Sequence, residues 1–259
     1  MILAYKGKQL FYEDKGSGPV TVLLHGFLEN HKMWNDIIKD FLPSNRFILL
    51  DLPGHGQSEV LEGVNTMHII AEAIHLLLET LHIKSVFLAG HSMGGYVALA
   101  FAKAYPAMAN GVLLLNSTPH GDTPERKKLR AHGVKVAAKN YEALVSMSVA
   151  NLFSQESNSR FEDKIQTTKQ EALKTPLAGY IAGQQGMMNR EDLSVFWKNS
   201  KMKKGMLLGS QDTLLNAENL HAEFSDFNVE IKPVDGGHMS QIENVNDCIK
   251  MLRWLITED

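Results

Sequence analysis

The sequence is short of the features that would place it in a specialised class of protein. It has one cysteine, Cys248, which excludes an internal disulfide and a metal site built from several cysteines. No apolar run approaches the roughly 18 residues that a membrane-spanning helix needs, and the first residues lack the long apolar stretch of a signal peptide. We therefore expect no membrane span and a cytoplasmic location.

The chain also has little excess charge. Its 26 Lys and Arg residues stand against 29 Asp and Glu, a net charge of −3, which argues against a nucleic-acid-binding surface. The charge is uneven, because residues 120–204 hold 15 basic and 9 acidic residues. A solvated helical surface is the simpler interpretation of this basic segment, and attraction of an anionic substrate is the alternative.

What the sequence does have is the composition of a globular protein with an α/β core. The 259 residues are 44% hydrophobic and 21% charged, enough to bury a large core without a disulfide or a metal. Short apolar runs alternate with amphipathic segments, as in a mostly parallel sheet covered by helices on both faces. The predicted strands are 20–24, 47–50, 86–89, 112–115, 206–208 and 229–231.

Helical periodicity fills most of the remaining chain. Thr66 is placed to cap a helix that runs to about residue 81, and residues 93–105 form another. Strand signals vanish from about 118 to 185, where helices are expected, and residues 242–256 close the chain as one amphipathic helix.

The N-terminus is expected to form an antiparallel hairpin. The segment 16–19 reads Gly-Ser-Gly-Pro, which is typical of a turn. It would join a strand around Phe11 and Tyr12 to the strand at 20–24.

The most informative segment joins the strand at 86–89 to the helix after it. Gly90-His91-Ser92-Met93-Gly94 reads G-x-S-x-G, in which small residues allow a turn sharp enough to hold the serine in a strained conformation. The Met93 N–H then lies at the helix N-terminus, where the helix dipole favours a developing anion. The segment predicts a serine nucleophile, and a glycine-rich turn that packs or binds phosphate is the alternative.

A serine nucleophile needs a histidine as base and a carboxylate that orients the histidine. Asp212 and His238 follow the last two predicted strands, so both are expected at the same sheet edge as Ser92. Asp235 is a rival acid, but a residue three positions before the histidine is typical of a loop-capping carboxylate. The predicted triad is therefore Ser92, Asp212 and His238.

Together these motifs resemble those of the α/β-hydrolase superfamily. The resemblance rests on five motifs, each at a predicted strand end: His25-Gly26-Phe27, Asp51 to Ser58, Gly90 to Gly95, Gly209 to Asp212, and Gly237-His238. It implies an α/β-hydrolase fold, with a mostly parallel central sheet flanked by helices. The core would be residues 1–117 and 186–259, with residues 118–185 inserted as a helical cap.

The resemblance also implies how the site would be built. The backbone N–H groups of Phe27 and Met93 would form the oxyanion hole, His25 would brace that loop, and His91 would be a packing residue. The triad would need no cofactor, and the chain has no H-E-x-x-H pattern for a metal. Six side chains are expected to bind the substrate: Leu28, Tyr96, Met147, Phe153, Tyr180 and Met188.

The expected activity is that of a carboxylesterase-like serine hydrolase (EC 3.1.1 class) acting on a small molecule through an acyl-enzyme. The sequence also resembles the menaquinone-pathway enzyme that eliminates pyruvate, which favours a lyase or a carbon-carbon hydrolase as an alternative. That enzyme has a carboxylate-binding arginine where Tyr96 stands here. A small-molecule receptor or signalling protein on the same fold is the non-enzymatic alternative, and the sequence predicts no oligomeric state.

Overall fold

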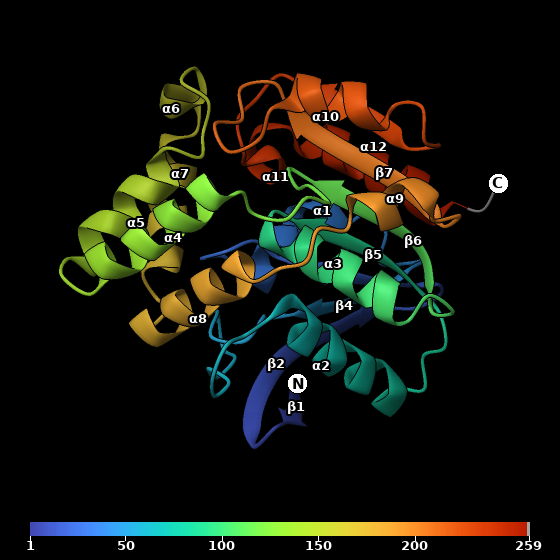
Figure 1. Ribbon diagram of the computed structural model, residues 1–259. Coiled ribbons are helices and arrows are strands. Elements are labelled where there is room, and N and C mark those ends of the chain that lie inside the picture. Colours follow the sequence, from blue (N-terminus) through green and yellow to red (C-terminus); the bar gives the residue numbers. More distant parts are fainter. Residues whose placement is uncertain (258–259) are drawn as a thin grey trace.

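A twisted eight-stranded sheet runs through the middle of the protein, with helices on both faces (Figure 1). The computed structural model describes residues 1–257. The strand order is β1-β2-β4-β3-β5-β6-β7-β8, antiparallel from β1 to β4 and parallel from there to β8. The strands are β1 (Ile2–Tyr5), β2 (Lys8–Gly16), β3 (Val20–Leu24), β4 (Arg46–Leu50), β5 (Val86–His91), β6 (Ala109–Leu115), β7 (Lys203–Gly209) and β8 (Glu230–Val234).

The central strands are apolar along their whole length because both sheet faces are covered. Alternate residues of β3 pack into separate clusters: Val22 and Leu24 against α2 and α3, and Leu23 against α1 and α12. The helices of the core are η1 (His31–Trp34), α1 (Asn35–Ile38), α2 (Met67–Thr80), α3 (Met93–Ala104), α9 (Ser194–Asn199), α10 (Ala217–Phe224), α11 (Ser240–Glu243) and α12 (Val245–Ile256).

Between β6 and β7 the chain forms the helical segment, residues 124–188. Its helices are α4 (Pro124–Ala137), α5 (Tyr141–Ala150), α6 (Ser157–Arg160), α7 (Glu162–Ala172) and α8 (Leu177–Met188). Figure 1 shows α4, α5 and α7 grouped to one side of the sheet. They share a small apolar cluster with Leu28 and Met239, which belong to loops of the core. The helical segment therefore packs on the loops at one edge of the sheet.

The predicted N-terminal hairpin is wrong in its pairing. Strand β2 pairs with β4 and not with β3, and the hairpin is formed by β1 and β2 around Lys6 and Gly7. Gly16 and Gly18 have positive φ angles, and the Arg46 N–H donates to the Pro19 carbonyl at 3.0 Å. The glycine-rich segment thus carries the chain past the start of β4, so β3 enters on its other side.

The predicted C-terminal helix is two helices. Asn244 separates α11 from α12 with φ −133° and ψ 43°, and its side chain donates to the Asp235 carbonyl at 3.0 Å. As a result Ile242 packs against the helical segment, whereas Ile249 and Leu252 pack under the sheet. The break turns the residues after His238 toward the helical segment. Within residues 1–257, no helix is long and apolar enough to cross a membrane.

Candidate active site

Ser92 lies at a sharp turn between β5 and α3. Its backbone has φ 49° and ψ −114°, a conformation that residues other than glycine rarely adopt. A Cβ atom at Gly90 would clash with the Gly94 backbone, and one at Gly94 would clash with the Leu24 carbonyl. Both glycines of the motif are therefore required by the close approach of the turn to the neighbouring backbone.

The structure brings the three predicted triad residues together. The Ser92 hydroxyl donates to His238 Nε2 across 2.8 Å, and His238 Nδ1 donates to Asp212 Oδ2 across 2.6 Å. The three residues follow β5, β8 and β7, whose carboxyl ends meet at one edge of the sheet. With Nδ1–H directed at the carboxylate, Nε2 faces the Ser92 hydroxyl, which is the geometry of a general base.

Asp212 is held as a buried carboxylate. Its Oδ1 accepts from the Leu214 N–H at 2.8 Å, and its Oδ2 accepts from Asn116 Nδ2 at 3.1 Å. Burial raises the pKa of Asp212, but His238 and these hydrogen bonds outweigh it and keep the pKa below its ordinary value. The rival Asp235 accepts from Gln211 Nε2 at 2.8 Å and makes no contact with His238.

Asn116 is a site residue that the sequence analysis missed. It directly follows β6 and has a φ of 44°. Its Nδ2 also donates to the Gly237 carbonyl at 3.1 Å, and its Oδ1 accepts from the Ser240 hydroxyl. Asn116 thus joins the loop of Asp212 to the loop of His238. Its place at a strand end, between apolar β6 and Ser117, was the available signal.

His91 is more than the packing residue that we expected. Its Nδ1 lies 2.7 Å from Glu29 Oε2 and its Nε2 lies 2.8 Å from the His238 carbonyl oxygen. Since both partners are acceptors, both ring nitrogens donate and the ring is an imidazolium. Burial alone would lower the pKa of His91, but the Glu29 carboxylate and the two hydrogen bonds raise it above its ordinary value.

Glu29 connects this ion pair to the loop after β3. The Gly26 N–H donates to Glu29 Oε2 at 2.6 Å, and Gln241 Nε2 donates to Oε1 at 2.7 Å. His25 braces the same loop, as expected: Nδ1–H donates to the Gly26 carbonyl at 2.7 Å and Nε2 accepts from the Leu52 N–H at 2.8 Å. Burial lowers the pKa of His25, which agrees with a neutral ring that accepts at one nitrogen.

A cavity of about 310 Å³ opens above Ser92 and His238. We call it the catalytic cavity. Of the side chains expected to bind substrate, Leu28, Tyr96 and Tyr180 line it, as does Phe27. The remaining polar lining comes largely from the helical segment, including Arg126, Arg130, Ser148, Thr168 and Gln184.

Three predicted substrate contacts are corrected by the structure, because none of them lines the catalytic cavity. Met147 is 60% exposed: Val145 and Val149 mark the inner face of α5, and a residue two positions from each points away. Phe153 is buried in the apolar cluster of the helical segment. Met187 lines the cavity in place of the predicted Met188, because successive residues on α8 are rotated by about 100° around the helix axis.

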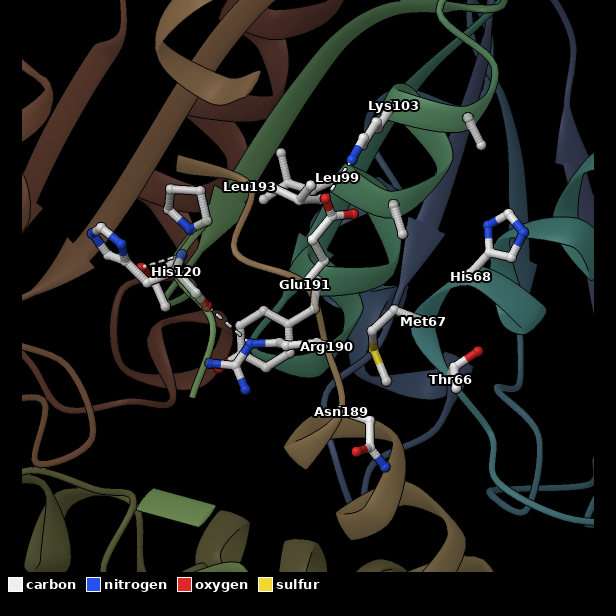
Figure 2. A pocket seen from close by; sticks show the side chains of 15 residues that line it. Thr66, Met67, His68, Leu99, Lys103, His120, Asn189, Arg190, Glu191 and Leu193 are labelled. Carbon is white, nitrogen blue, oxygen red and sulfur yellow. Dashed lines mark hydrogen bonds and ion pairs between the residues drawn. The ribbon is translucent and has the colours of Figure 1, made fainter. Parts of the chain in front are cut away.

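A second and larger cavity, about 480 Å³, lies on the other side of Tyr96. Figure 2 shows its lining, in which Lys103 of α3 reaches Glu191 at 2.5 Å. The Arg190 guanidinium stacks over the Tyr96 ring at 4.0 Å and forms part of the wall. Ser92 and His238 are absent from this lining and line the smaller cavity instead.

No group of three or more His, Cys, Asp or Glu side chains in the described part of the chain is arranged to hold a metal ion.

Comparison with known proteins gives matches along nearly the whole chain. It is 26% identical to 3-oxoadipate enol-lactonase 1 of Acinetobacter baylyi, over 97% of this chain and 94% of that protein. The structure of a thermophilic esterase from Thermogutta terrifontis matches with a TM-score of 0.91 and 27% identity, over 98% of this chain and 96% of that one. The enol-lactonase structure from Burkholderia xenovorans LB400, at 23% identity, shares the fold with a TM-score of 0.89 and full coverage of both chains.

Other curated relatives are matched over only a part of their length. The match spans 7% of Protein PHYLLO from Arabidopsis thaliana, at 31% identity, and 33% of an uncharacterized protein from Mycobacterium tuberculosis, at 34% identity. The model of one protein family, described as alpha/beta hydrolase fold, matches residues 19–245. Since this match covers most of the chain, the protein belongs to the alpha/beta hydrolase fold family.

Proposed function

We propose that the protein is a serine hydrolase that cleaves a carboxylic ester bond of a small molecule through an acyl-enzyme on Ser92. The observation that carries this proposal is the continuous hydrogen-bond chain from the Ser92 hydroxyl through His238 to Asp212, at 2.8 and 2.6 Å. It stands at a strained turn beside a cavity that can hold a small molecule. The esterase and enol-lactonase among the matched proteins support ester chemistry, including that of ring esters.

In the first half-reaction His238 Nε2 takes the hydroxyl proton while Ser92 Oγ attacks the ester carbonyl carbon. The carbonyl π electrons move to oxygen and give a tetrahedral oxyanion. When it collapses, the bond to the alcohol oxygen breaks and the imidazolium returns the proton to that oxygen. Water then repeats the sequence on the acyl-enzyme, which releases the acid and regenerates the Ser92 hydroxyl.

The backbone N–H groups of Phe27 and Met93 are proposed to hold the oxyanion. Met93 is the first residue of α3, and its N–H has no intrahelical acceptor. Among residues 1–257 neither N–H makes a hydrogen bond to another backbone or side-chain group. Each donor in such a site is worth about 2.7 to 4 kcal/mol of transition-state stabilisation.

The helical segment is proposed to act as the cap over this site. Helices α4 to α8 span residues 124–188, close to the 118–185 expected from the sequence. The His238 N–H donates to the Leu152 carbonyl at 2.7 Å, and the Thr213 hydroxyl donates to the Asn151 carbonyl at 3.2 Å. The end of α5 therefore contacts both loops that carry the base and the acid, so the segment can shape the cavity without supplying the triad.

The test is the intact mass of the protein after incubation with a small organophosphonate that labels activated serines. We expect one adduct on the wild type and none on Ser92→Ala or His238→Ala. Ser148→Ala is the matched control, because Ser148 lines the same cavity but its hydroxyl donates to the Leu144 carbonyl and has no histidine partner. An adduct that persists on Ser92→Ala, or is absent from folded wild type, would contradict the proposal. Labelling without turnover of esters would favour a receptor.

A further inference from the structure

Three arginines surround one buried carboxylate where the helical segment meets the core. Asp122 precedes α4 and its side chain is fully buried. Its oxygens lie 2.6 Å from Arg130 Nε, 2.5 Å from Arg190 Nη1 and 3.7 Å from Arg126 Nε. Burial raises the pKa of Asp122, but Arg130 and Arg190 outweigh it and keep the pKa below its ordinary value, so the group is ionised. One negative charge therefore faces three positive charges.

The excess positive charge is directed to the catalytic cavity. Arg190 is occupied elsewhere: its Nε donates to the His120 carbonyl at 3.0 Å and its Nη1 to the Met187 carbonyl at 3.1 Å, on the side of the second cavity (Figure 2). Arg126 and Arg130, in contrast, line the catalytic cavity together with Ser92. They lie one helical turn apart on α4, so their guanidinium groups share one face.

Both of these guanidinium groups keep a donor to spare. Arg130 uses Nε for Asp122 and Nη1 for the Gln184 side-chain oxygen at 3.1 Å, and Arg126 uses Nη1 for the Leu214 carbonyl at 3.1 Å. Neither Nη2 has a hydrogen-bond partner among residues 1–257. Among the described residues that line the cavity, Glu29 is the acidic one, and it is paired with His91.

We propose that Arg126 and Arg130 form an anion subsite, so that the preferred substrate is a small ester bearing a carboxylate. This inference rests on the proposed function and names the substrate class of the same cavity. Guanidinium groups in a partly buried cavity bind carboxylates by charge-assisted, often bidentate hydrogen bonds. Apolar side chains also line the cavity, including Phe27, Leu28 and Met187, and they fit a short apolar spacer between the ester and the carboxylate.

Binding without turnover tests the subsite directly. In the Ser92→Ala protein we would measure, by calorimetry, the affinity for 4-nitrophenyl hydrogen glutarate and for its neutral methyl ester, and likewise for 4-acetoxybenzoate and its methyl ester. The first pair places the carboxylate on the acyl side and the second on the alcohol side. We expect the anionic member of at least one pair to bind about 10- to 100-fold more weakly when Arg126→Gln and Arg130→Gln are added.

The matched control removes the same charge from the same helix. Lys127 and Lys128 are exposed neighbours on α4 outside the cavity lining, so Lys127→Gln with Lys128→Gln should leave the anionic preference unchanged. Arg126→Gln alone is the variant least expected to misfold. Arg126 is 30% exposed, and its Nε lies 3.7 Å from Asp122 Oδ1, which is beyond hydrogen-bond distance. Equal binding of anionic and neutral esters, or an equal loss in the lysine variant, would overturn the subsite.

Turnover separates this inference from the proposed function. In the otherwise wild-type protein, the ratio of kcat/KM between anionic and neutral esters should fall by the same factor in the arginine variant. If the anionic esters bind more weakly in the arginine variant but the protein hydrolyses no ester, the subsite would be supported and the hydrolase proposal contradicted. Hydrolysis of all four esters with no dependence on the arginines would do the reverse.

Discussion

The sheet edge and the helical segment form opposite walls of one cavity, but they are built in different ways. At the sheet edge, Ser92 has a strained backbone with a positive φ, and a Cβ atom at Gly94 would clash with the Leu24 carbonyl. In the helical segment, α4 buries only Ala137, and α5 buries only Val145 and Val149. We infer that the edge is built for one chemistry, whereas α4 and α5, which bury few residues, can change their cavity-facing side chains at less cost to the fold than the edge or α8.

The largest expected effect comes from the sheet edge. His238→Ala should lower kcat for every ester by about 10⁴-fold or more, because the nucleophile loses its base and the triad acts as a unit. Steady-state kinetics on a neutral and an anionic ester would measure it, with circular dichroism to show that the fold is retained. A loss confined to one ester would contradict this expectation, since the sheet edge would then be setting substrate selectivity.

A smaller but still general loss is expected from the Glu29–His91 pair. Glu29→Gln should lower kcat about 10- to 100-fold with little change in KM, because Glu29 positions the loop of Phe27 and, through His91, the backbone of His238. Glu62→Gln is a control at a carboxylate whose side chain is 91% exposed. A change in KM alone would assign Glu29 to substrate binding instead.

The same pair gives a pH dependence of stability. The pKa of His91 is raised above its ordinary value of 6.5, so its contribution is complete below pH 6.5 and is lost as the pH rises through the folded-state value. The pKa of Glu29 is lowered from 4.5, so its contribution is complete above pH 4.5 and is lost as the pH falls through the folded-state value. The pair therefore stabilises the fold most between pH 4.5 and pH 6.5, where both contributions are complete.

Urea unfolding of wild type and His91→Gln would measure this effect. The difference in free energy of unfolding should be greatest near pH 5.5, on the order of 3 kcal/mol, and should shrink toward alkaline pH. His68→Gln, at an exposed histidine of α2, is the control. A difference that grows with pH would contradict the imidazolium.

The last prediction, which includes the smallest expected effect, separates two methionines of the helical segment. Met187→Ala should cost about 2 to 5 kcal/mol of stability and change KM, because Met187 is buried and lines the catalytic cavity. Met147→Ala should change stability by no more than about 0.5 kcal/mol and leave KM unchanged, because Met147 is 60% exposed. A similar response from both would show that the cavity differs from the one described.

The sequence could predict the sheet edge because the constraints there act on the backbone. A turn that excludes a Cβ atom requires glycine, which made Gly90 and Ser92 recognisable from the sequence alone. The carboxyl ends of parallel strands meet at one sheet edge, which made Asp212 and His238 recognisable as partners of Ser92. The fold and its family followed from the same motifs. Asn116 was missed because its role depends on three partners distant in sequence.

The helical segment was less predictable because side-chain direction on a helix depends on its rotation about its own axis. Met147 and Met188 are apolar, as a pocket-lining residue should be, but neither lines the catalytic cavity. No sequence motif fixes which face of a helix turns toward a cavity. The hairpin failed for a related reason: segment 16–19 has the residues of a tight turn but carries the chain across β4. Local propensity indicates where the chain turns, and tertiary packing decides which strand it meets.

Trapping the acyl-enzyme on Ser92 would be the sharpest experiment on the proposed mechanism. During steady turnover of 4-nitrophenyl butyrate, acid quenching and peptide mapping would locate the acyl group, because loss of nitrophenolate is fast and deacylation then limits the rate. We expect one butyryl group on the peptide that contains Ser92, and none after Ser92→Ala. Turnover that continues in Ser92→Ala, or an acyl group on another residue, would contradict it.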